Sequence, residues 1–295
     1  MNKNIFISGG SGFIGANLAN YLVKKNYKVT VYDNFKSKYL NSNAKFVKGD
    51  ILDLKKLSNA ISGNNIVFHL AGIADIEECN KKPQEAINAN IIGTSNILEA
   101  AGKNRVKQFM FGSSMYVYND LASYYSLTKK ISEMLIEEFS KKYKINFTFL
   151  RYGSLYGPLS QEWNALNRYI KEILNNKSIT YYGTGEETRE YIHIEDAINL
   201  TIKCMNKKYY NKAVIITGQQ SISSKKILQM IFEILNLDFH KIKYSKKQNK
   251  KFHYNITPYK FDIKEATRIV PSEYIDLGSG LVQLIENINN FKEKK

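Results

Sequence analysis

The chain has 295 residues, of which 43% are hydrophobic and 24% charged, and a formal net charge of +16; this composition excludes disordered and fibrous proteins and allows one large or two modest globular domains. Its apolar stretches fall short of the ~18 residues of a membrane span, and the first predicted strand follows Met1-Asn2-Lys3 directly, so we expect neither a membrane segment nor a signal peptide. The two cysteines, Cys79 and Cys204, make no disulfide framework and no nucleic-acid module is recognisable, so we expect a cytoplasmic protein without a specific nucleic-acid partner.

The first predicted unit is a strand, a glycine-rich turn, a helix and a second strand, from Lys3 to Asp33. Gly9, Gly12 and Gly15 have the spacing of a dinucleotide-binding turn. The first glycine allows the sharp turn, the second lets a pyrophosphate approach backbone N–H groups, and the third lets the helix pack close to the sheet. Asp33 ends the second strand, where a carboxylate accepts hydrogen bonds from the adenosine ribose. Glycine triplets also close ordinary surface turns, but strand, helix and acidic end at these offsets favour a dinucleotide.

The alternating pattern continues with a strand over 44–51, a helix over 54–61 and a strand over 65–72. The nearly continuous apolar run of the last strand is typical of a parallel strand covered on both faces. Within it, His69 is expected to be a hydrogen-bonded core histidine rather than a catalyst.

A helix over 86–104 and a strand over 108–114 follow, and the strand ends in Ser113 and Ser114. Ligands of open α/β sheets bind at the carboxyl edge of the strands. We therefore expect these two hydroxyls to face a bound ligand.

The next helix opens with Tyr125 and carries Lys129 four residues later, on the same face. A phenol ionises near pH 10 in water, and a nearby ammonium ion together with a positive nicotinamide ring favours the phenolate. Tyr125 is thus a candidate general acid–base for alcohol–ketone interconversion, and Ser114 a hydrogen-bond donor to the same substrate oxygen. Tyr-x-x-x-Lys alone more often reflects helix packing, but here it follows the glycine turn and the serine-ended strand.

The pattern of the second half of the chain predicts a substrate domain, and we expect this domain to share a cleft with the domain formed by the first half. Six elements are expected: a helix over 163–175, a strand over 179–182, a strand-to-helix segment over 191–205, a strand over 213–218, and helices over 224–235 and 279–291. Lys241 to Lys251 holds six lysines in eleven residues; a solvated face is the simpler interpretation, and attraction of an anionic substrate or polymer is the other.

These motifs together resemble the extended short-chain dehydrogenase/reductases of the nucleotide-sugar epimerase/dehydratase group, over nearly the whole chain. The resemblance rests on Gly9-Gly10-Ser11-Gly12-Phe13-Ile14-Gly15, Val31-Tyr32-Asp33-Asn34, Gly49-Asp50-Ile51, His69-Leu70-Ala71-Gly72, Asn90-Ile91-Ile92-Gly93-Thr94, Ser113-Ser114 with Val117-Tyr118, Tyr125 with Lys129, Leu150 to Pro158, and Gly183-Thr184-Gly185 with Arg189 to Asp196.

The resemblance implies an α/β fold: a Rossmann doubly wound parallel sheet over residues 1–150, to which 191–220 returns, and a smaller α/β substrate domain mainly over 151–295. It also implies NAD or NADP, a nucleoside-diphosphate sugar, no metal, and a homodimer. The implied cofactor-binding residues are Gly9, Gly12, Phe13, Ile14, Gly15, Asp33, Asn34, Asp50, Ile51, Leu70, Ala71, Gly72, Asn90, Ser113, Tyr125, Lys129 and Tyr152.

Four residues receive roles in catalysis or substrate binding from the resemblance. Ser114 orients the sugar C4 hydroxyl, Tyr125 moves its proton, and Lys129 holds the nicotinamide ribose. Arg189 binds the substrate diphosphate, because the N–H donors of its guanidinium form a fixed fork that matches phosphate oxygens.

Four departures from the family pattern narrow the reaction. Met115-Tyr116 stands where dehydratases place Asp-Glu, which disfavours a 4,6-elimination. Residues 119–124 form an unusually short segment over the sugar, as in some 4-ketoreductases. Gly153 replaces a frequent Asn near the nicotinamide. A second diphosphate-binding arginine is not evident, and Lys250 or Lys251 is a candidate substitute.

The leading hypothesis is a nucleotide-sugar 4-epimerase, with a 4-keto-6-deoxy-sugar 4-reductase as the alternative. A non-catalytic dinucleotide sensor is less favoured, because Ser114, Tyr125 and Lys129 are all present. Asp33 favours NAD over NADP, whereas Lys36 and Lys38 leave NADP open.

Overall fold

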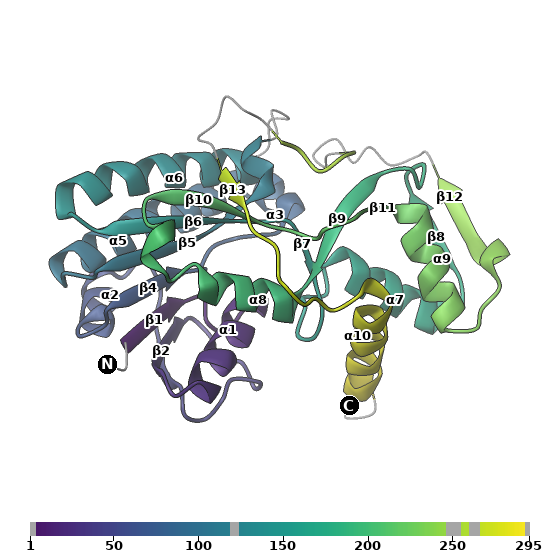
Figure 1. Ribbon diagram of the computed structural model, residues 1–295, viewed down its shortest axis with the longest axis horizontal. Coiled ribbons are helices and arrows are strands. Elements are labelled where there is room, and N and C mark those ends of the chain that lie inside the picture. The colour runs from purple at the N-terminus through teal and green to yellow at the C-terminus, as the bar shows by residue number, and fades with distance from the viewer. Residues whose placement is uncertain (1–3, 119–123, 246–254, 260–265, 293–295) are drawn as a thin grey trace.

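The computed structural model describes residues 4–118, 124–245, 255–259 and 266–292. Its largest element is an eight-stranded sheet in the order β13-β10-β6-β5-β4-β1-β2-β3, in which every neighbouring pair is parallel (Figure 1). The strands are β1 (Asn4–Ser8), β2 (Lys28–Asp33), β3 (Lys45–Lys48), β4 (Ile66–His69), β5 (Gln108–Ser114), β6 (Asn146–Tyr152), β10 (Lys212–Ile216) and β13 (Ala266–Arg268). With helices on both faces, this sheet confirms the predicted doubly wound α/β fold.

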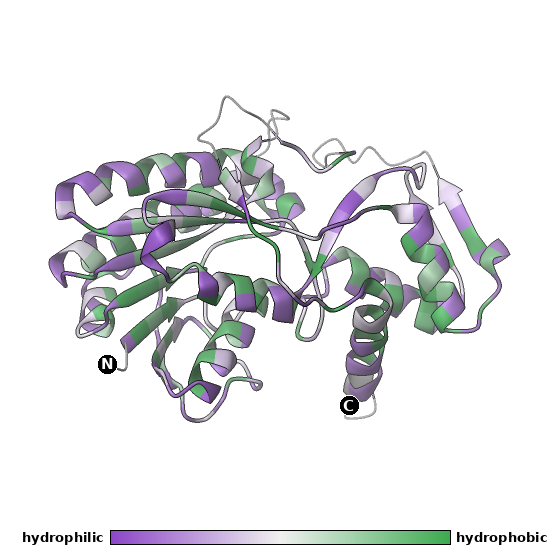
Figure 2. Ribbon diagram, viewed as in Figure 1, coloured by the Kyte–Doolittle hydropathy of each residue, from purple (hydrophilic) through white to green (hydrophobic). Residues whose placement is uncertain are grey.

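Alternate residues of the strands pack into two separate hydrophobic cores, one on each face of the sheet. In β1, Ile5 and Ile7 belong to the core that contains Leu18, whereas Phe6 belongs to the core that contains Leu57. The helices that close the first core are α1 (Phe13–Lys24) and α8 (Ile194–Lys203), and those that close the second are α2 (Leu54–Ile61), α5 (Gly93–Lys103) and α6 (Tyr124–Tyr143) (Figure 1). Strands such as β1 and β4 are accordingly hydrophobic over most of their length (Figure 2).

A second unit lies beyond the carboxyl edge of the sheet, on the right of Figure 1. It comprises α7 (Ala165–Asn176), α9 (Ser224–Ile234), α10 (Leu277–Lys292) and the paired strands β8 (Ile179–Tyr182) and β12 (Ile242–Ser245). Its own core contains Ile170, Ile231 and Leu284, one residue from each helix. The strands β7 (Ser154–Tyr156), β9 (Thr188–His193) and β11 (Ser221–Ser223) form a three-stranded sheet between the two units (Figure 1).

The structure differs from the sequence prediction in several elements. In place of the single helix expected over 86–104, the chain forms α4 (Pro83–Ile87), a π-helical turn (Asn88–Ile92) and then α5. A further helix that was not predicted, α3 (Ile76–Lys81), precedes α4. The strand expected over 65–72 is shorter, Ile66–His69, and Gly72 (φ +147) lies in the loop that follows it. β13, an outer strand of three residues, carries no sequence signal of its own. Short 3-10 turns span Met115–Tyr118, Lys207–Tyr209 and Phe239–Lys241.

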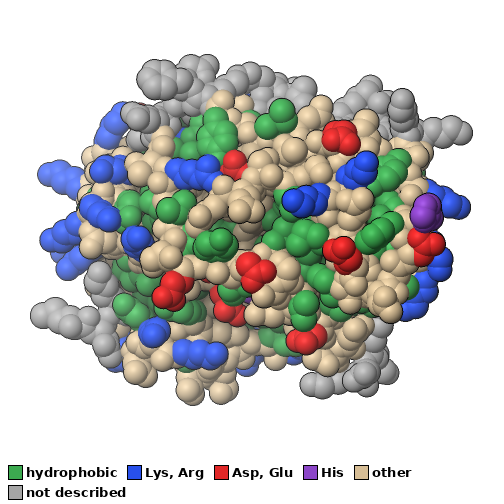
Figure 3. Space-filling view, turned by 45° about the vertical axis from the view of Figure 1, so that its right-hand side comes forward, with side chains coloured by type: hydrophobic (Ala, Val, Ile, Leu, Met, Phe, Trp, Pro, Cys, Tyr) green, Lys and Arg blue, Asp and Glu red, His purple; other side chains and the backbone are tan. Residues whose placement is uncertain are grey.

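The basic residues are distributed over much of the surface. In the view of Figure 3, Lys and Arg side chains gather toward the edges, and Asp and Glu side chains are scattered over the middle. Of the basic run Lys241 to Lys251, the described part forms the end of a 3-10 turn and β12. Among the described residues, no helix is long and apolar enough to cross a membrane.

Candidate active site

A cavity of about 2070 Å³ follows the carboxyl edge of the large sheet and continues into the second unit. Pockets for drug-sized ligands measure roughly 300–1,000 Å³, so this volume suits two large ligands side by side. Its wall includes all but one of the predicted site residues: Gly9, Gly12, Phe13, Ile14, Gly15, Asp33, Asn34, Asp50, Ile51, Leu70, Ala71, Gly72, Ser113, Ser114, Tyr125, Lys129, Tyr152 and Arg189. The exception is Asn90.

The three glycines of the first turn are required for different reasons. Gly9 has φ +71, and a Cβ there would lie 2.5 Å from the backbone N of Ala71. A Cβ at Gly15 would lie 2.1 Å from the carbonyl O of Gly9. Gly12 has an ordinary φ of −75°, and its Cβ would meet only the Gly9 carbonyl, at 3.4 Å. The protein itself therefore requires the first and third glycines, whereas the space at the second is left for a ligand.

Asp33 lies at the end of β2, beside this turn. Its Oδ2 accepts a hydrogen bond from Ser11 N at 2.9 Å, which ties the second strand to the glycine turn. Burial raises the pKa of the carboxyl, and backbone hydrogen bonds from Ser11 and Phe35 act against that shift. Lys36, which the sequence offered as a phosphate ligand, has its Nζ 5.9 Å from the ring centre of Phe46.

Ser114, Tyr125 and Lys129 come from β5 and α6, which pack against each other. The ammonium Nζ of Lys129 donates to Gly112 O at 2.7 Å and lies 5.9 Å from the centre of the Tyr125 ring. Burial lowers the pKa of Lys129 to about 8, and the charge of Glu133 is among the influences that raise it. Ser114 Oγ accepts from Tyr116 N at 3.2 Å. A phenol, a hydroxyl and a cation thus share one wall of the cavity.

The ring of Tyr125 is held by packing that the sequence did not reveal. Tyr116 meets it edge to face, with ring centres 5.9 Å apart, and also lines the cavity. Ile76 and Cys79 of α3 pack into the same cluster. Tyr116 is therefore an additional candidate contact for a substrate.

Asn90 lies behind the cavity wall and acts on it indirectly. Its side-chain amide accepts from Ile73 N at 2.8 Å and donates to Ile73 O at 3.0 Å and Thr128 Oγ1 at 3.1 Å. These bonds fasten the loop after β4 to α6. The expectation that His69 is a core histidine is confirmed: it bonds Ser8 and Thr94, each at 2.8 Å, and burial lowers its pKa to about 3.

Two other predicted cofactor residues direct their hydroxyls away from the cavity they line. Ser113 Oγ donates to Glu133 Oε1 at 2.6 Å, and Tyr152 shares a hydrogen bond of 2.7 Å with Thr201. Both hydroxyls are therefore engaged in hydrogen bonds within the protein.

Arg189 lies on β9 and lines the cavity. Its Nη1 donates to Thr188 O at 2.8 Å and to Asn255 O at 3.3 Å. The proposed substitutes Lys250 and Lys251 lie outside the described residues.

Gly153, which departs from the family pattern, is required by its neighbour across the sheet. A Cβ at this position would lie 2.1 Å from Thr217 Oγ1, so the threonine takes the space that a side chain would need.

Comparison with known proteins settles the family. Residues 5–216 match the profile of the NAD dependent epimerase/dehydratase family. The chain belongs to this family.

Several relatives resemble the chain over most of its length. It is 32% identical to a UDP-N-acetyl-alpha-D-glucosaminuronate decarboxylase of Bacillus cytotoxicus over 260 residues, 79% of this chain and 81% of that protein. The UDP-glucose 4-epimerase of Thermotoga maritima, solved with UDP-glucose, has a TM-score of 0.86 at 25% identity and covers 98% and 99% of the two chains. The UDP-glucuronic acid 4-epimerase of Bacillus cereus, solved with UDP-glucuronic acid and NAD, has a TM-score of 0.82 at 25% identity over 98% and 99%.

NAD is the cofactor of the family, and the residues of this chain fit it. The open space at Gly12 lies at the N-terminus of α1, where unpaired N–H groups and the helix dipole favour a pyrophosphate. Asp33 lines the cavity at the end of β2, where its carboxylate suits a ribose 2′-hydroxyl and repels a 2′-phosphate. In the described part of the chain, no group of three His, Cys, Asp or Glu side chains is placed to hold a metal ion.

Proposed function

We propose that this chain is a nucleoside-diphosphate-sugar 4-epimerase. The observation that carries the proposal is that Ser114, Tyr125 and Lys129 lie on the wall of one cavity that extends from the glycine turn to Arg189. This arrangement suits a cofactor at one end, a diphosphate at the other and a sugar between them.

The bound NAD would supply a hydride acceptor at C4 and return the hydride to the opposite face. Tyr125 takes the proton of the C4 hydroxyl and gives it back, and Ser114 donates a hydrogen bond to the same oxygen. The Lys129 ammonium favours the phenolate form of Tyr125 and, as the family resemblance implies, holds the nicotinamide ribose. Since one proton and one hydride leave and both return, the sugar is isomerised without net oxidation.

Arg189 is proposed to bind the diphosphate of the substrate. Arg189 lines the same cavity as the glycine turn, and its guanidinium offers donors in a fork that matches phosphate oxygens. The neighbouring segment 255–259 is tied to β9 by Thr188 N, which donates to Asn255 O at 2.8 Å.

The residues after Ser114 argue against dehydration. Met115 has a thioether without an ionisable proton and is wholly buried in a cluster with Val117 and Tyr118, so it supplies neither an acid nor a base to the sugar. The competing function is a 4-keto-6-deoxy-sugar 4-reductase. It rests on the short segment 119–124, of which residues 119–123 lie outside the described part of the chain.

The test is a panel of nucleotide sugars given with NAD to the wild-type protein. UDP-glucose, UDP-galactose, UDP-N-acetylglucosamine and UDP-glucuronate are supplied separately, and the C4 epimers are identified by proton NMR. An epimerase reaches the same equilibrium mixture from either epimer, and Tyr125→Phe serves as the control. Conversion of 4-keto sugars with reduced cofactor, and of no hydroxy sugar, would establish the reductase instead. The predicted homodimer is tested separately by light scattering.

A further inference from the structure

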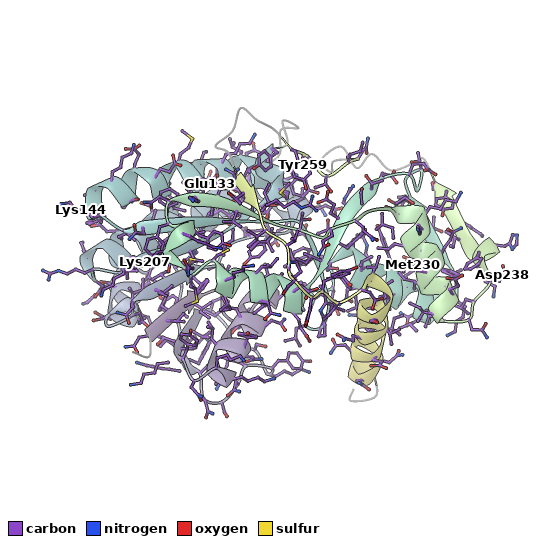
Figure 4. The ribbon with its side chains drawn as sticks, viewed as in Figure 1. Glu133, Lys144, Lys207, Met230, Asp238 and Tyr259 are labelled. Carbon is purple, nitrogen blue, oxygen red and sulfur yellow. The ribbon has the colours of Figure 1, made fainter. Side chains whose placement is uncertain are left out.

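A buried ion pair lies behind the reacting residues. The Glu133 carboxylate of α6 accepts from Arg151 Nε at 3.0 Å and from Nη2 at 2.7 Å, and the Arg151 side chain is 0% exposed. Figure 4 labels Glu133 beside the strands of the large sheet. Apolar residues of similar volume often replace such buried pairs without loss of stability, so a role other than stability is worth testing for this pair.

Two hydroxyl groups extend the pair to neighbouring elements. Ser113 Oγ donates to Glu133 Oε1 at 2.6 Å, and Arg151 Nη1 donates to Tyr118 OH at 2.6 Å. Ser113 and Arg151 are register partners on β5 and β6. The pair thereby joins two strands, α6 and the 3-10 turn that follows Ser114.

The same contact region holds the reacting residues. Ser114 follows Ser113 directly, and Lys129 is one helical turn before Glu133. Lys129 bonds Gly112 O while Glu133 bonds Ser113 Oγ, so two successive residues of β5 are fastened to two successive turns of α6. The separation of β5 and α6 at this point decides how far Ser114 stands from Tyr125.

We propose that Glu133 and Arg151 are positioning residues for the 4-epimerase reaction, and this inference rests on the function proposed above. They fix β5 against α6 so that Ser114 and Tyr125 meet the same substrate oxygen. Neither is among the residues that line the cavity, so they act through their neighbours.

The charge of Glu133 gives the proposal a second observable. The groups around the Lys129 ammonium are Glu133 and Tyr125 on its own helix, Cys79 from α3, His69 from β4 and the Phe111 ring from β5. At neutral pH His69 is uncharged, and burial raises the pKa of the Cys79 thiol to about 11. Glu133 is the carboxylate in this set, and its loss lowers the pKa of Lys129.

The experiment compares four variants of the full-length protein. Glu133→Gln removes the charge, Glu133→Gln with Arg151→Met replaces the pair by neutral side chains, and Ser113→Ala removes one hydrogen bond. Glu138→Gln is the matched control, since Glu138 lies on the same helix, is exposed and pairs with Lys141. For each, we measure the melting temperature, the Kd for NAD, kcat, KM, and the pH midpoint of Lys129 acetylation by acetic anhydride, read by peptide mass spectrometry.

The proposal predicts that the first three variants lose about tenfold or more in kcat, with KM and the Kd for NAD within about twofold of the wild type. The acetylation midpoint falls in Glu133→Gln and is unchanged in Ser113→Ala and Glu138→Gln. The positioning role is overturned if the folded double variant, Glu133→Gln with Arg151→Met, has the kcat of the wild type. It is also overturned if Ser113→Ala has the kcat of the wild type. Ser113→Ala decides the matter if the pair variants do not fold.

Failure of the proposed function gives a different result. In that case the wild type converts no nucleotide sugar, whereas the Lys129 acetylation midpoint, which needs no substrate, still reports on Glu133. An unchanged midpoint in folded Glu133→Gln contradicts the coupling to Lys129 whatever the substrate.

Discussion

Gly12→Ala separates cofactor binding from folding. The backbone at Gly12 has an ordinary φ, and an added Cβ meets only one carbonyl at 3.4 Å, so the fold accepts it. Alanine is a poorer helix N-cap than glycine, which destabilises the folded protein by roughly 0.5–1 kcal/mol. Alanine also lowers the conformational entropy of the unfolded chain, which stabilises the folded protein by a similar amount. We expect a melting temperature within about 3 °C of the wild type, since each kcal/mol shifts it by roughly 2–4 °C.

Gly15→Ala is the matched opposite case. A Cβ at this position would lie 2.1 Å from the carbonyl O of Gly9 and 2.7 Å from Gly10 Cα. These are backbone atoms, which cannot relieve the clash by changing rotamer as a side chain can. Overpacking costs about 1–3 kcal/mol, and we expect a cost of about 3 kcal/mol because backbone must move. At roughly 2–4 °C per kcal/mol, the melting temperature should fall by about 6–12 °C.

Isothermal titration calorimetry with NAD decides between the two effects. The Gly12→Ala methyl group occupies the space left for the pyrophosphate, so we expect its affinity to fall by about tenfold or more, equal to ~1.4 kcal/mol. Gly278→Ala is the control, because Gly278 does not line the cavity, its φ is not positive, and a Cβ there would meet only the Asp276 side chain, at 3.2 Å. Wild-type NAD affinity in a folded Gly12→Ala protein would refute the placement of the pyrophosphate.

Four further predictions concern the reaction. Tyr125→Phe should lower kcat by about a hundredfold or more while NAD binding is kept, and near-normal turnover would rule out Tyr125 as the acid–base group. Arg189→Ala should raise KM more than it lowers kcat, because a diphosphate is bound in ground and transition states alike; an unchanged KM places the diphosphate elsewhere. Turnover should fall as pH rises through about 8, where Lys129 loses its charge, whereas a plateau to high pH speaks against a role for that charge. Asp33 should give NAD the higher affinity, and a preference for NADP would show that this carboxylate does not govern the choice.

Local signals made the glycine turn and the neighbouring carboxylate of the cavity wall predictable. The spacing of Gly9, Gly12 and Gly15 and the carboxylate of Asp33 fall within one continuous βαβ unit, so their geometry follows from the sequence order alone. The end of β5 at Ser114 was also found, since an apolar run that stops at two serines indicates both the strand and its edge.

Long-range packing was not predictable in the same way. The requirement for Gly153 comes from Thr217, a residue 64 positions away whose side chain fills the space. Glu133 has the appearance of an exposed residue on a charged helix, and only the fold reveals that Arg151, on the next strand, lies against it. Asn90 belongs to a recognisable motif, yet its amide bonds the loop after β4 and α6 instead of lining the cavity.

In the proposed reaction, hydride leaves C4 of the sugar and returns to the same carbon. The most direct test uses a nucleotide sugar deuterated at C4, chosen from the substrates that the panel identifies, with NAD and the wild-type protein. An epimerase gives the inverted sugar with the deuterium still at C4 and no net change in the amount of NAD. Stoichiometric consumption of reduced cofactor with 4-keto-6-deoxy sugars, and no inversion of the deuterated sugar, would contradict the account.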